Sequence, residues 1–130
     1  MQTNLVKQTL KAGKCVYGTS LEDCLDPEIA AIPGVDALFI GPYDLTLALG
    51  IIGQFENPIF WQAVDRVIKA ADKAGVGAGL QSRDMPLLLE ARSRGARFLL
   101  YSSDVGVLFD GYKQAIGHLK GASAATRVLY

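Results

Sequence analysis

An apolar run that ends in a glycine, a proline and an aspartate is the segment with the clearest capacity for chemistry. Val35–Ile40 is followed directly by Gly41-Pro42-Tyr43-Asp44. An apolar run of this length suits a strand buried on both faces, and the Gly-Pro pair excludes a long helix there. Asp44 is therefore predicted at the carboxyl end of a parallel strand, where α/β proteins bind their ligands. The residues support two interpretations equally: Asp44 contacts a ligand, or it only caps a turn.

The rest of the chain alternates helix and strand patterns, as a parallel sheet requires. The clearest helix opens at Asn57-Pro58, carries apolar residues on one stripe and stops at Gly75. In chain order we expect a helix from Asn4 to Gly13, a strand at Lys14–Ser20, a helical turn from Asp26 to Ile32, the strand at Val35–Ile40, the helix from Asn57 to Gly75, a strand at Val76–Leu80, a helix from Asp84 to Gly95, a strand at Arg97–Tyr101 and a helix from Asp104 to about Lys120. This order predicts βαβ units with right-handed crossovers in one α/β domain over residues 1–130.

Composition excludes several classes of partner. Half of the 130 residues are hydrophobic, and thirteen basic residues balance thirteen acidic ones, so we expect no nucleic-acid partner and no membrane partner. The sequence shows no secretory signal and no apolar stretch of membrane-spanning length, which predicts a cytoplasmic protein. Cys15 and Cys24, beside the single His118, are too few and too poorly spaced for a structural zinc site.

A set of motifs resembles a known enzyme family over most of the chain. The residues that carry the resemblance are Ile32-Pro33-Gly34-Val35-Asp36, Phe39-Ile40-Gly41-Pro42-Tyr43-Asp44-Leu45, Gly50, Asn57-Pro58, Gly75, Ala78-Gly79 and Ser103-Asp104. From Ile32 to about Gly111 the chain resembles the C-terminal part of the HpcH/HpaI aldolase family, the metal-dependent class II pyruvate aldolases built on a TIM barrel. Asn4 to Ile29 resembles the N-terminal helix and first strand of the same family.

Together the two resemblances imply that residues 1–31 match the family's beginning and residues 32–120 its C-terminal half, with residues 121–130 as a tail. A complete barrel takes roughly 250 residues, so the middle of the barrel is missing. The expected fold is α/β, a partial (half) TIM barrel, whose parallel strands are equivalent to barrel strands 1, 6, 7 and 8, with helices on the outer face. The four strands would form one contiguous sheet.

The resemblance also implies a site that lacks several catalytic groups. Such aldolases hold a divalent cation with one Glu and one Asp, and magnesium or manganese suits that chemistry. The Asp ligand maps onto Asp44, and the grip on the pyruvate carboxylate maps onto Gly41, Pro42 and Tyr43, of which Pro42 has no N–H to donate. Gln81 maps to a position at the mouth of the family's active site, near the aldehyde acceptor. It either influences which aldehyde is accepted or is a polar residue at the rim of the site with no role in the reaction. The Glu ligand, the imidazole and the guanidinium have no counterpart, so the catalytic residues are unassigned.

Three functions are compatible with this pattern. The first is an aldolase-type carbon–carbon lyase acting on pyruvate, a small 2-oxo acid, and an aldehyde. The second is a catalytically inactive truncated remnant that folds and oligomerises, and the third is oxaloacetate decarboxylation or oxo-acid binding alone. Asp44 favours the first and third, whereas the missing Glu, His and Arg favour the second. Arg83 is the one credible replacement for the anion clamp, and we expect magnesium or manganese to bind weakly if at all.

The open sheet of a half-barrel predicts self-association. Its inner face and two edges would expose apolar side chains and unpaired backbone groups. In Val35–Ile40 both alternating sets of side chains contain large apolar members, so one such set must face inward. We therefore expect a homo-oligomer in which two copies pair through these faces or edges, as a pseudo-barrel or a swapped dimer.

Overall fold

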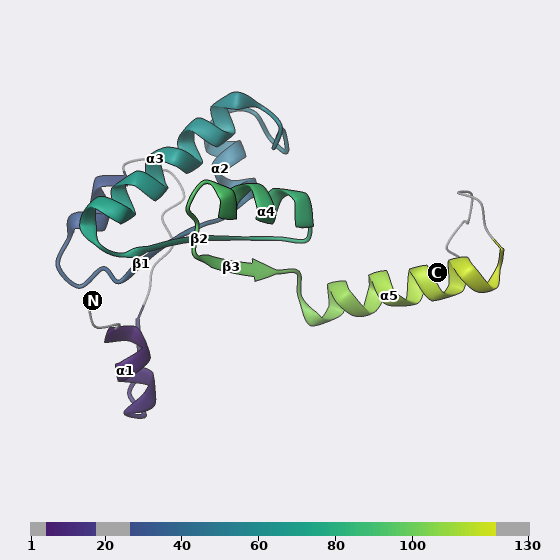
Figure 1. The fold of residues 1–130 in the computed structure, drawn as a ribbon, viewed down its shortest axis with the longest axis horizontal. Helices are drawn as coiled ribbons and strands as arrows, with labels where there is room; N and C mark the ends of the chain where they lie inside the picture. The colour runs from purple at the N-terminus through teal and green to yellow at the C-terminus, as the bar shows by residue number, and fades with distance from the viewer. Residues whose placement is uncertain (1–4, 18–26, 122–130) are drawn as a thin grey trace.

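A computed structural model of the chain describes residues 5–17 and 27–121, and all structural statements below refer to these residues. Parallel strands lie beside one another and two crossover helices pack against them (Figure 1). The helices are α1 (Leu5–Lys11), the 3-10 helix η1 (Pro27–Ala31), α2 (Pro42–Ala48), α3 (Pro58–Ala74), α4 (Met85–Ser93) and α5 (Asp104–Leu119); the strands are β1 (Ala37–Ile40), β2 (Gly77–Ser82) and β3 (Phe98–Tyr101).

The sheet has the order β1-β2-β3, with both neighbouring pairs parallel. Ile40 in β1 is level with Leu80 in β2, which is level with Leu99 in β3. Since the strands run in the same direction, their carboxyl ends meet at one edge, and the loops that follow them lie side by side there. The predicted α/β class with parallel strands is confirmed.

Helix α3 forms as its sequence pattern predicts. Asn57 caps it, because its side-chain oxygen accepts a hydrogen bond from the Ile59 N–H at 3.0 Å. Pro58 occupies the first turn, and Gly75 ends the helix in the left-handed conformation with φ 74°. The apolar stripe Phe60, Val64, Ile68 and Ala71 is buried. This helix therefore covers one face of the sheet and supplies much of the core.

Helices cover one face of the sheet, whereas side chains on the other face are exposed. Ala78 and Leu80 of β2 are buried in a cluster with side chains from α3 and α4. On the other face lie Phe39, Gly77, Gly79, Phe98 and Leu100, which we call the open sheet face. Phe39, Phe98 and Leu100 are 42%, 47% and 42% exposed. The alternation of a strand's side chains thus places one apolar set in the core and leaves the other uncovered.

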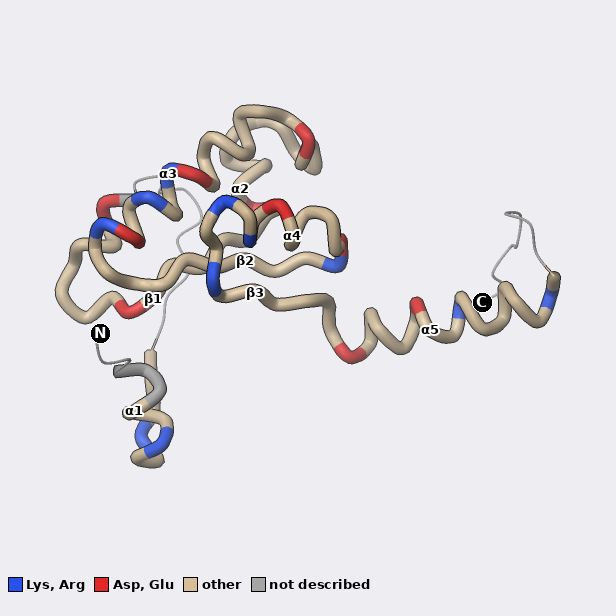
Figure 2. Tube along the Cα trace, in the orientation of Figure 1, with Lys and Arg blue, Asp and Glu red and all other residues tan. Residues whose placement is uncertain are grey.

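Ion pairs connect α3 to the elements that follow it. Arg94 bonds Asp65 at 2.9 Å and lies 4.7 Å from the centre of the Trp61 ring. Burial lowers the pKa of Arg94, but its hydrogen bonds to Asp65 and Glu90 outweigh this and raise the pKa above its usual value. Basic and acidic residues are interspersed along α3 (Figure 2). No helix in the described ranges is long and apolar enough to cross a membrane.

The strand predicted at Lys14–Ser20 is wrong for residues 14–17, and residues 18–20 lie outside the described ranges. The Lys14 N–H instead bonds the Thr9 carbonyl at 3.0 Å, which continues the end of α1. Tyr17 is 94% exposed. A short alternating segment becomes a strand only where a sheet edge is available to pair with it. The described sheet therefore has three strands, and the expected equivalent of barrel strand 1 is not among them.

Helix α2 was not predicted, and the boundaries of other elements differ from the prediction by small amounts. Pro42 starts α2, because proline suits the first helical position, and the Leu45 N–H bonds the Gly41 carbonyl at 2.9 Å. Helix α5 begins at Asp104 as predicted, and Ser103 caps it, since its Oγ accepts from the Gly106 N–H at 3.1 Å. The strand predicted to begin at Val35 starts at Ala37.

Candidate functional site

The candidate site lies where the three strands end. β1 runs into the Gly41–Asp44 turn, β2 into Ser82–Asp84, and β3 into Ser102–Ser103. The parallel register brings these three connections to one edge of the sheet. Ligand sites of parallel α/β folds occupy this edge, because its loops are free of core packing.

The Gly41 turn holds the Asp44 carboxylate close to the backbone. Gly41 has extended backbone angles, φ −84° and ψ 107°, and a Cβ atom placed on it would overlap Asp44 Oδ2. Glycine is therefore needed for the carboxylate to fold back over the turn. Asp44 is exposed, and within the described part of the chain its carboxylate has no hydrogen bond or ion pair. It is available to a ligand.

Buried contacts hold this turn in place. Pro42 is buried, while Tyr43 is exposed and meets the Phe55 ring edge-on with centroids 4.9 Å apart. Thr46 is fully buried: its Oγ1 donates to the Tyr43 carbonyl at 2.9 Å and accepts from the Gly53 N–H at 3.0 Å. These bonds connect α2 to the loop after it. The position of Asp44 is consequently fixed by packing behind it.

Gln81 lies near this turn on the neighbouring strand. Ile40 pairs with Leu80, so the next residues along, Gly41 and Gln81, stand level with each other. Neighbouring strands are about 4.8 Å apart. Gln81 is exposed, and the alternation of β2 places it on the side of the open sheet face. The structure thus brings Gly41, Asp44 and Gln81 to one corner of the sheet, while their contact with a substrate stays a prediction.

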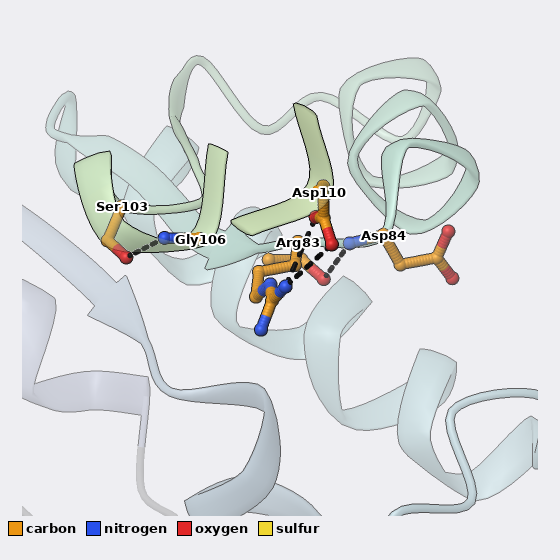
Figure 3. A network of polar contacts seen from close by, with 6 residues as sticks. Arg83, Asp84, Ser103, Gly106 and Asp110 are labelled. Atoms are coloured by element: carbon orange, nitrogen blue, oxygen red, sulfur yellow. Dashed lines mark hydrogen bonds and ion pairs between the residues drawn. The ribbon is translucent and has the colours of Figure 1, made fainter. Parts of the chain in front are cut away.

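A divalent cation would find few ligands at this corner. In residues 5–17 and 27–121 no group of three His, Cys, Asp or Glu side chains is arranged to hold a metal ion. Asp104 Oδ1 accepts from the Val105 N–H at 2.8 Å. The Asp84 carboxylate points away from its neighbours in Figure 3. Asp44 alone does not fit a complete magnesium or manganese site, which generally needs several oxygen ligands.

Arg83 is already engaged by a carboxylate. Its guanidinium bonds both oxygens of Asp110 on α5 at 3.1 Å, as Figure 3 shows. The side chain follows β2 at the predicted edge, but it is directed to α5 rather than to Asp44. A clamp for a substrate anion at Arg83 would require this pair to open, so Arg83 is a weaker candidate than its position in the sequence predicts.

Sequence reasoning missed the unusual backbone at Ser102. Its φ is 52°, the left-handed region that non-glycine residues rarely adopt. Its Oγ is buried and has no hydrogen-bond partner in the described structure. A Cβ atom placed on Gly106 would overlap this oxygen, so the first turn of α5 packs tightly on it. A serine after a strand carries no signal of such a conformation.

We expect Ser102→Gly to raise the free energy of unfolding by about 1 kcal/mol. Glycine removes the left-handed strain and the buried unpaired hydroxyl, and these gains exceed the entropy that an added glycine costs. Urea denaturation of the two proteins measures the change. Ser102→Ala is the matched control, because it removes only the hydroxyl. If the glycine variant were no more stable than the alanine variant, the left-handed backbone at Ser102 would not be strained.

The residues that form this sheet edge match a known protein family. A model of the HpcH/HpaI aldolase/citrate lyase family matches residues 24–110, which include the Gly41–Asp44 turn and all three described strands. The chain belongs to this family. It is 38% identical over 93 residues to a hydroxypyruvate/pyruvate aldolase of Paraburkholderia phytofirmans, a match that covers 72% of this chain. It is also 38% identical over 82 residues to a 5-keto-4-deoxy-D-glucarate aldolase of Klebsiella pneumoniae, covering 61% of this chain.

Solved structures of the HpcH/HpaI family share the fold. A family protein from Burkholderia cenocepacia superposes with a TM-score of 0.68 at 38% identity, covering 72% of this chain and 37% of the other. An HpcH/HpaI aldolase from Desulfitobacterium hafniense gives 0.66 at 36% identity, covering 78% and 39%. The expected partial barrel is thereby confirmed, as three parallel strands with helices on one face.

This HpcH/HpaI chain spans only about a third of the length of the relatives that it matches. The matches cover 36% of the Paraburkholderia aldolase and 31% of the Klebsiella aldolase. The family match begins at residue 24, so the resemblance of residues before it to the family's N-terminus stays a prediction. The activities and substrates that the relatives' names state are therefore proposals for this chain.

Proposed function

We propose that this chain provides the 2-oxo-acid side of an aldolase site, with Asp44 as a metal ligand and the Gly41–Tyr43 turn as the grip on the substrate carboxylate. The observation that carries the proposal is the exposed, unpaired Asp44 carboxylate over Gly41, at a strand end inside the family match. The names of the relatives, hydroxypyruvate/pyruvate aldolase among them, support pyruvate and an aldehyde as substrates. Gln81, level with Gly41, would face the aldehyde.

The same geometry favours a second candidate, an inactive chain that folds and binds without turning over. No cluster of three metal-ligating side chains occurs in the described ranges, and Arg83 is paired with Asp110. We therefore assign no catalytic step to this chain's own residues. Between the two candidates lies binding of a small 2-oxo acid, or decarboxylation of oxaloacetate. A cytoplasmic location and magnesium or manganese as the metal belong to the proposal as well.

Metal binding should be weak and should depend on Asp44. One carboxylate supplies too few oxygen ligands, so we expect a dissociation constant for Mn²⁺ on the order of millimolar. Isothermal calorimetry measures it. Asp44→Ala should abolish the binding heat, whereas Asp84→Ala, which removes another exposed carboxylate at the same edge, should not. Micromolar affinity lost on Asp44→Ala would contradict this and indicate a complete site.

Pyruvate should tighten the binding of Mn²⁺ if the turn grips a 2-oxo acid. The oxo acid would add oxygen ligands to the ion, and by thermodynamic linkage each ligand then favours the other, about tenfold. The same calorimetric titration is run with pyruvate or with acetate, which has the carboxylate but no keto oxygen. Equal metal affinity in both would argue against oxo-acid binding and leave the inactive chain as the better description.

A further inference from the structure

The segment that joins α2 to α3 lies at the same edge of the sheet as the candidate site. β1 ends at this edge and α2 follows it directly, whereas β2 starts at the opposite edge, because the two strands are parallel. Helix α3 therefore has to run from the site edge to the opposite edge. Residues 49–57, which we call the α2–α3 loop, accordingly stand beside the Gly41–Asp44 turn.

Hydrogen bonds give the α2–α3 loop a defined shape. The Ile51 N–H bonds the Thr46 carbonyl and the Gln54 N–H bonds the Ile51 carbonyl, both at 2.9 Å. Gly53 is in the left-handed conformation with φ 69°, which glycine adopts without strain. Its N–H donates to the buried Thr46 Oγ1 at 3.0 Å. The loop is thereby fastened to α2 and can support the turn from which α2 starts.

Phe55, in this loop, lies between an exposed ring and a buried ring. It meets Tyr43 edge-on, with ring centres 4.9 Å apart and an angle of 86°, and Phe60 at 5.6 Å and 71°. Tyr43 is 67% exposed, whereas Phe60 is fully buried in the core. Edge-to-face pairs at these distances are favourable beyond the apolar area that they bury. Phe55 thus connects the side chain of Tyr43 to the core of the domain.

The Gly41–Asp44 turn needs this support because α2 is short. The helix has seven residues, and helices below about 12 residues are marginal in water without tertiary contacts. The Tyr43 carbonyl accepts a hydrogen bond from Thr46 Oγ1 at 2.9 Å. Tyr43 is therefore held at two points, its carbonyl by Thr46 and its ring by Phe55.

We propose that Phe55 is a positioning residue for the 2-oxo acid. It holds the Tyr43 ring, and with it the backbone of the Gly41–Tyr43 turn, in the place where the turn binds the substrate carboxylate beside Asp44. This inference rests on the proposed function and gives Phe55 no contact with the substrate. Removal of the ring contact leaves the Asp44 carboxylate in the chain but misplaces the grip, so the loss falls on the oxo acid rather than on the metal.

A residue that only fills the core would behave differently. Its loss lowers the free energy of unfolding and the folded fraction, but the molecules that stay folded bind with unchanged affinity. A positioning residue changes the affinity of the folded molecules themselves. The ratio of the Mn²⁺ affinities in pyruvate and in acetate separates the two roles, because both affinities are measured on the same protein and a smaller folded fraction affects them equally.

Phe55→Leu tests the positioning role in that calorimetric titration. Leucine keeps an apolar side chain in the loop but removes the ring that meets Tyr43. The ratio, about ten in the wild-type chain, should fall to about two, because an edge-on ring pair accounts for about fivefold. The Mn²⁺ affinity in acetate should not change. Circular dichroism verifies that the variant is folded at the temperature of the titration.

Trp61→Leu is the matched control. It removes another ring of the same row, which meets Phe60 at 5.0 Å and has no ring contact with Tyr43 among the described residues. Its ratio should stay at about ten. An unchanged ratio in Phe55→Leu, or an equal fall in Trp61→Leu, would overturn the positioning role alone. A wild-type ratio of one would refute the proposed function, and the positioning role with it.

Hydrogen exchange measures the hold on the turn with no ligand present. The Leu45 N–H bonds the Gly41 carbonyl at 2.9 Å, so its exchange with deuterium reports opening of the turn. Phe55→Leu should speed this exchange about fivefold, and Trp61→Leu should leave it unchanged. Exchange at Leu45 that is the same in wild-type and Phe55→Leu chains would overturn the positioning role, whatever the metal titration gives.

Discussion

Turnover of a pyruvate aldol by this chain should be at or near background, at least about ten-thousandfold below a complete enzyme of this chemistry. A general acid or base and an electrostatic stabiliser of the enolate each contribute about a hundredfold or more. Among residues 5–17 and 27–121 no such pair of groups lies at the Asp44 corner: Arg83 is held by Asp110, and His118 lies in the last turn of α5, which extends away from the sheet (Figure 1). The loss is multiplicative because the two groups act on the same transition state.

The rate is measured as pyruvate release from an aldol substrate in the presence of Mn²⁺, coupled to a lactate dehydrogenase. Asp44→Ala is the control, and its rate should equal that of the unchanged chain. Oxaloacetate in the same assay tests decarboxylation separately. Turnover of even a few per second that disappears with Asp44→Ala would contradict the prediction and show that another residue or another chain completes the site.

The fold was predictable wherever local signals agreed with one another. In α3 the Asn57 cap, the Pro58 start, the apolar stripe and the Gly75 stop all indicate the same helix. Lys14–Tyr17 alternates well enough for a strand, but alternation does not reveal whether a sheet edge is present to pair with it. Helix α2 is short and begins at a Gly-Pro pair, a signal that also fits a plain turn. These failures concern tertiary context rather than propensity.

In the candidate site, too, features set by local sequence were predictable and features set by tertiary contacts were not. The Gly41–Asp44 turn was predictable, because a buried strand followed by Gly-Pro-x-Asp constrains the backbone locally. The engagement of Arg83 was not, since Asp110 lies 27 residues further along the chain and meets it only because of the direction that α5 takes. The left-handed Ser102 was also beyond prediction, because tight packing on Gly106 holds it there.

Gly79→Ala should lower the free energy of unfolding by about 3 kcal/mol. Gly79 lies in the central strand and pairs with Phe39 on one side and Phe98 on the other. A Cβ atom placed on it would overlap the Phe98 carbonyl oxygen and Cβ, and a backbone atom cannot move aside as a flexible side chain can. The added methyl group would push β3 away from β2, adding lost pairing to the cost of overpacking, which is itself about 1–3 kcal/mol.

Gly77→Ala provides a control on the same strand and the same face. A Cβ atom there meets nothing within 4 Å, so stability should change by no more than about 0.5 kcal/mol. Both variants are unfolded in urea at the same protein concentration, with Trp61 fluorescence as the readout. Because both substitutions replace glycine by alanine in β2, their unfolded-state effects cancel in the difference. Equal stability of the two variants would mean that β2 and β3 do not approach each other as closely at Gly79 as the structure places them.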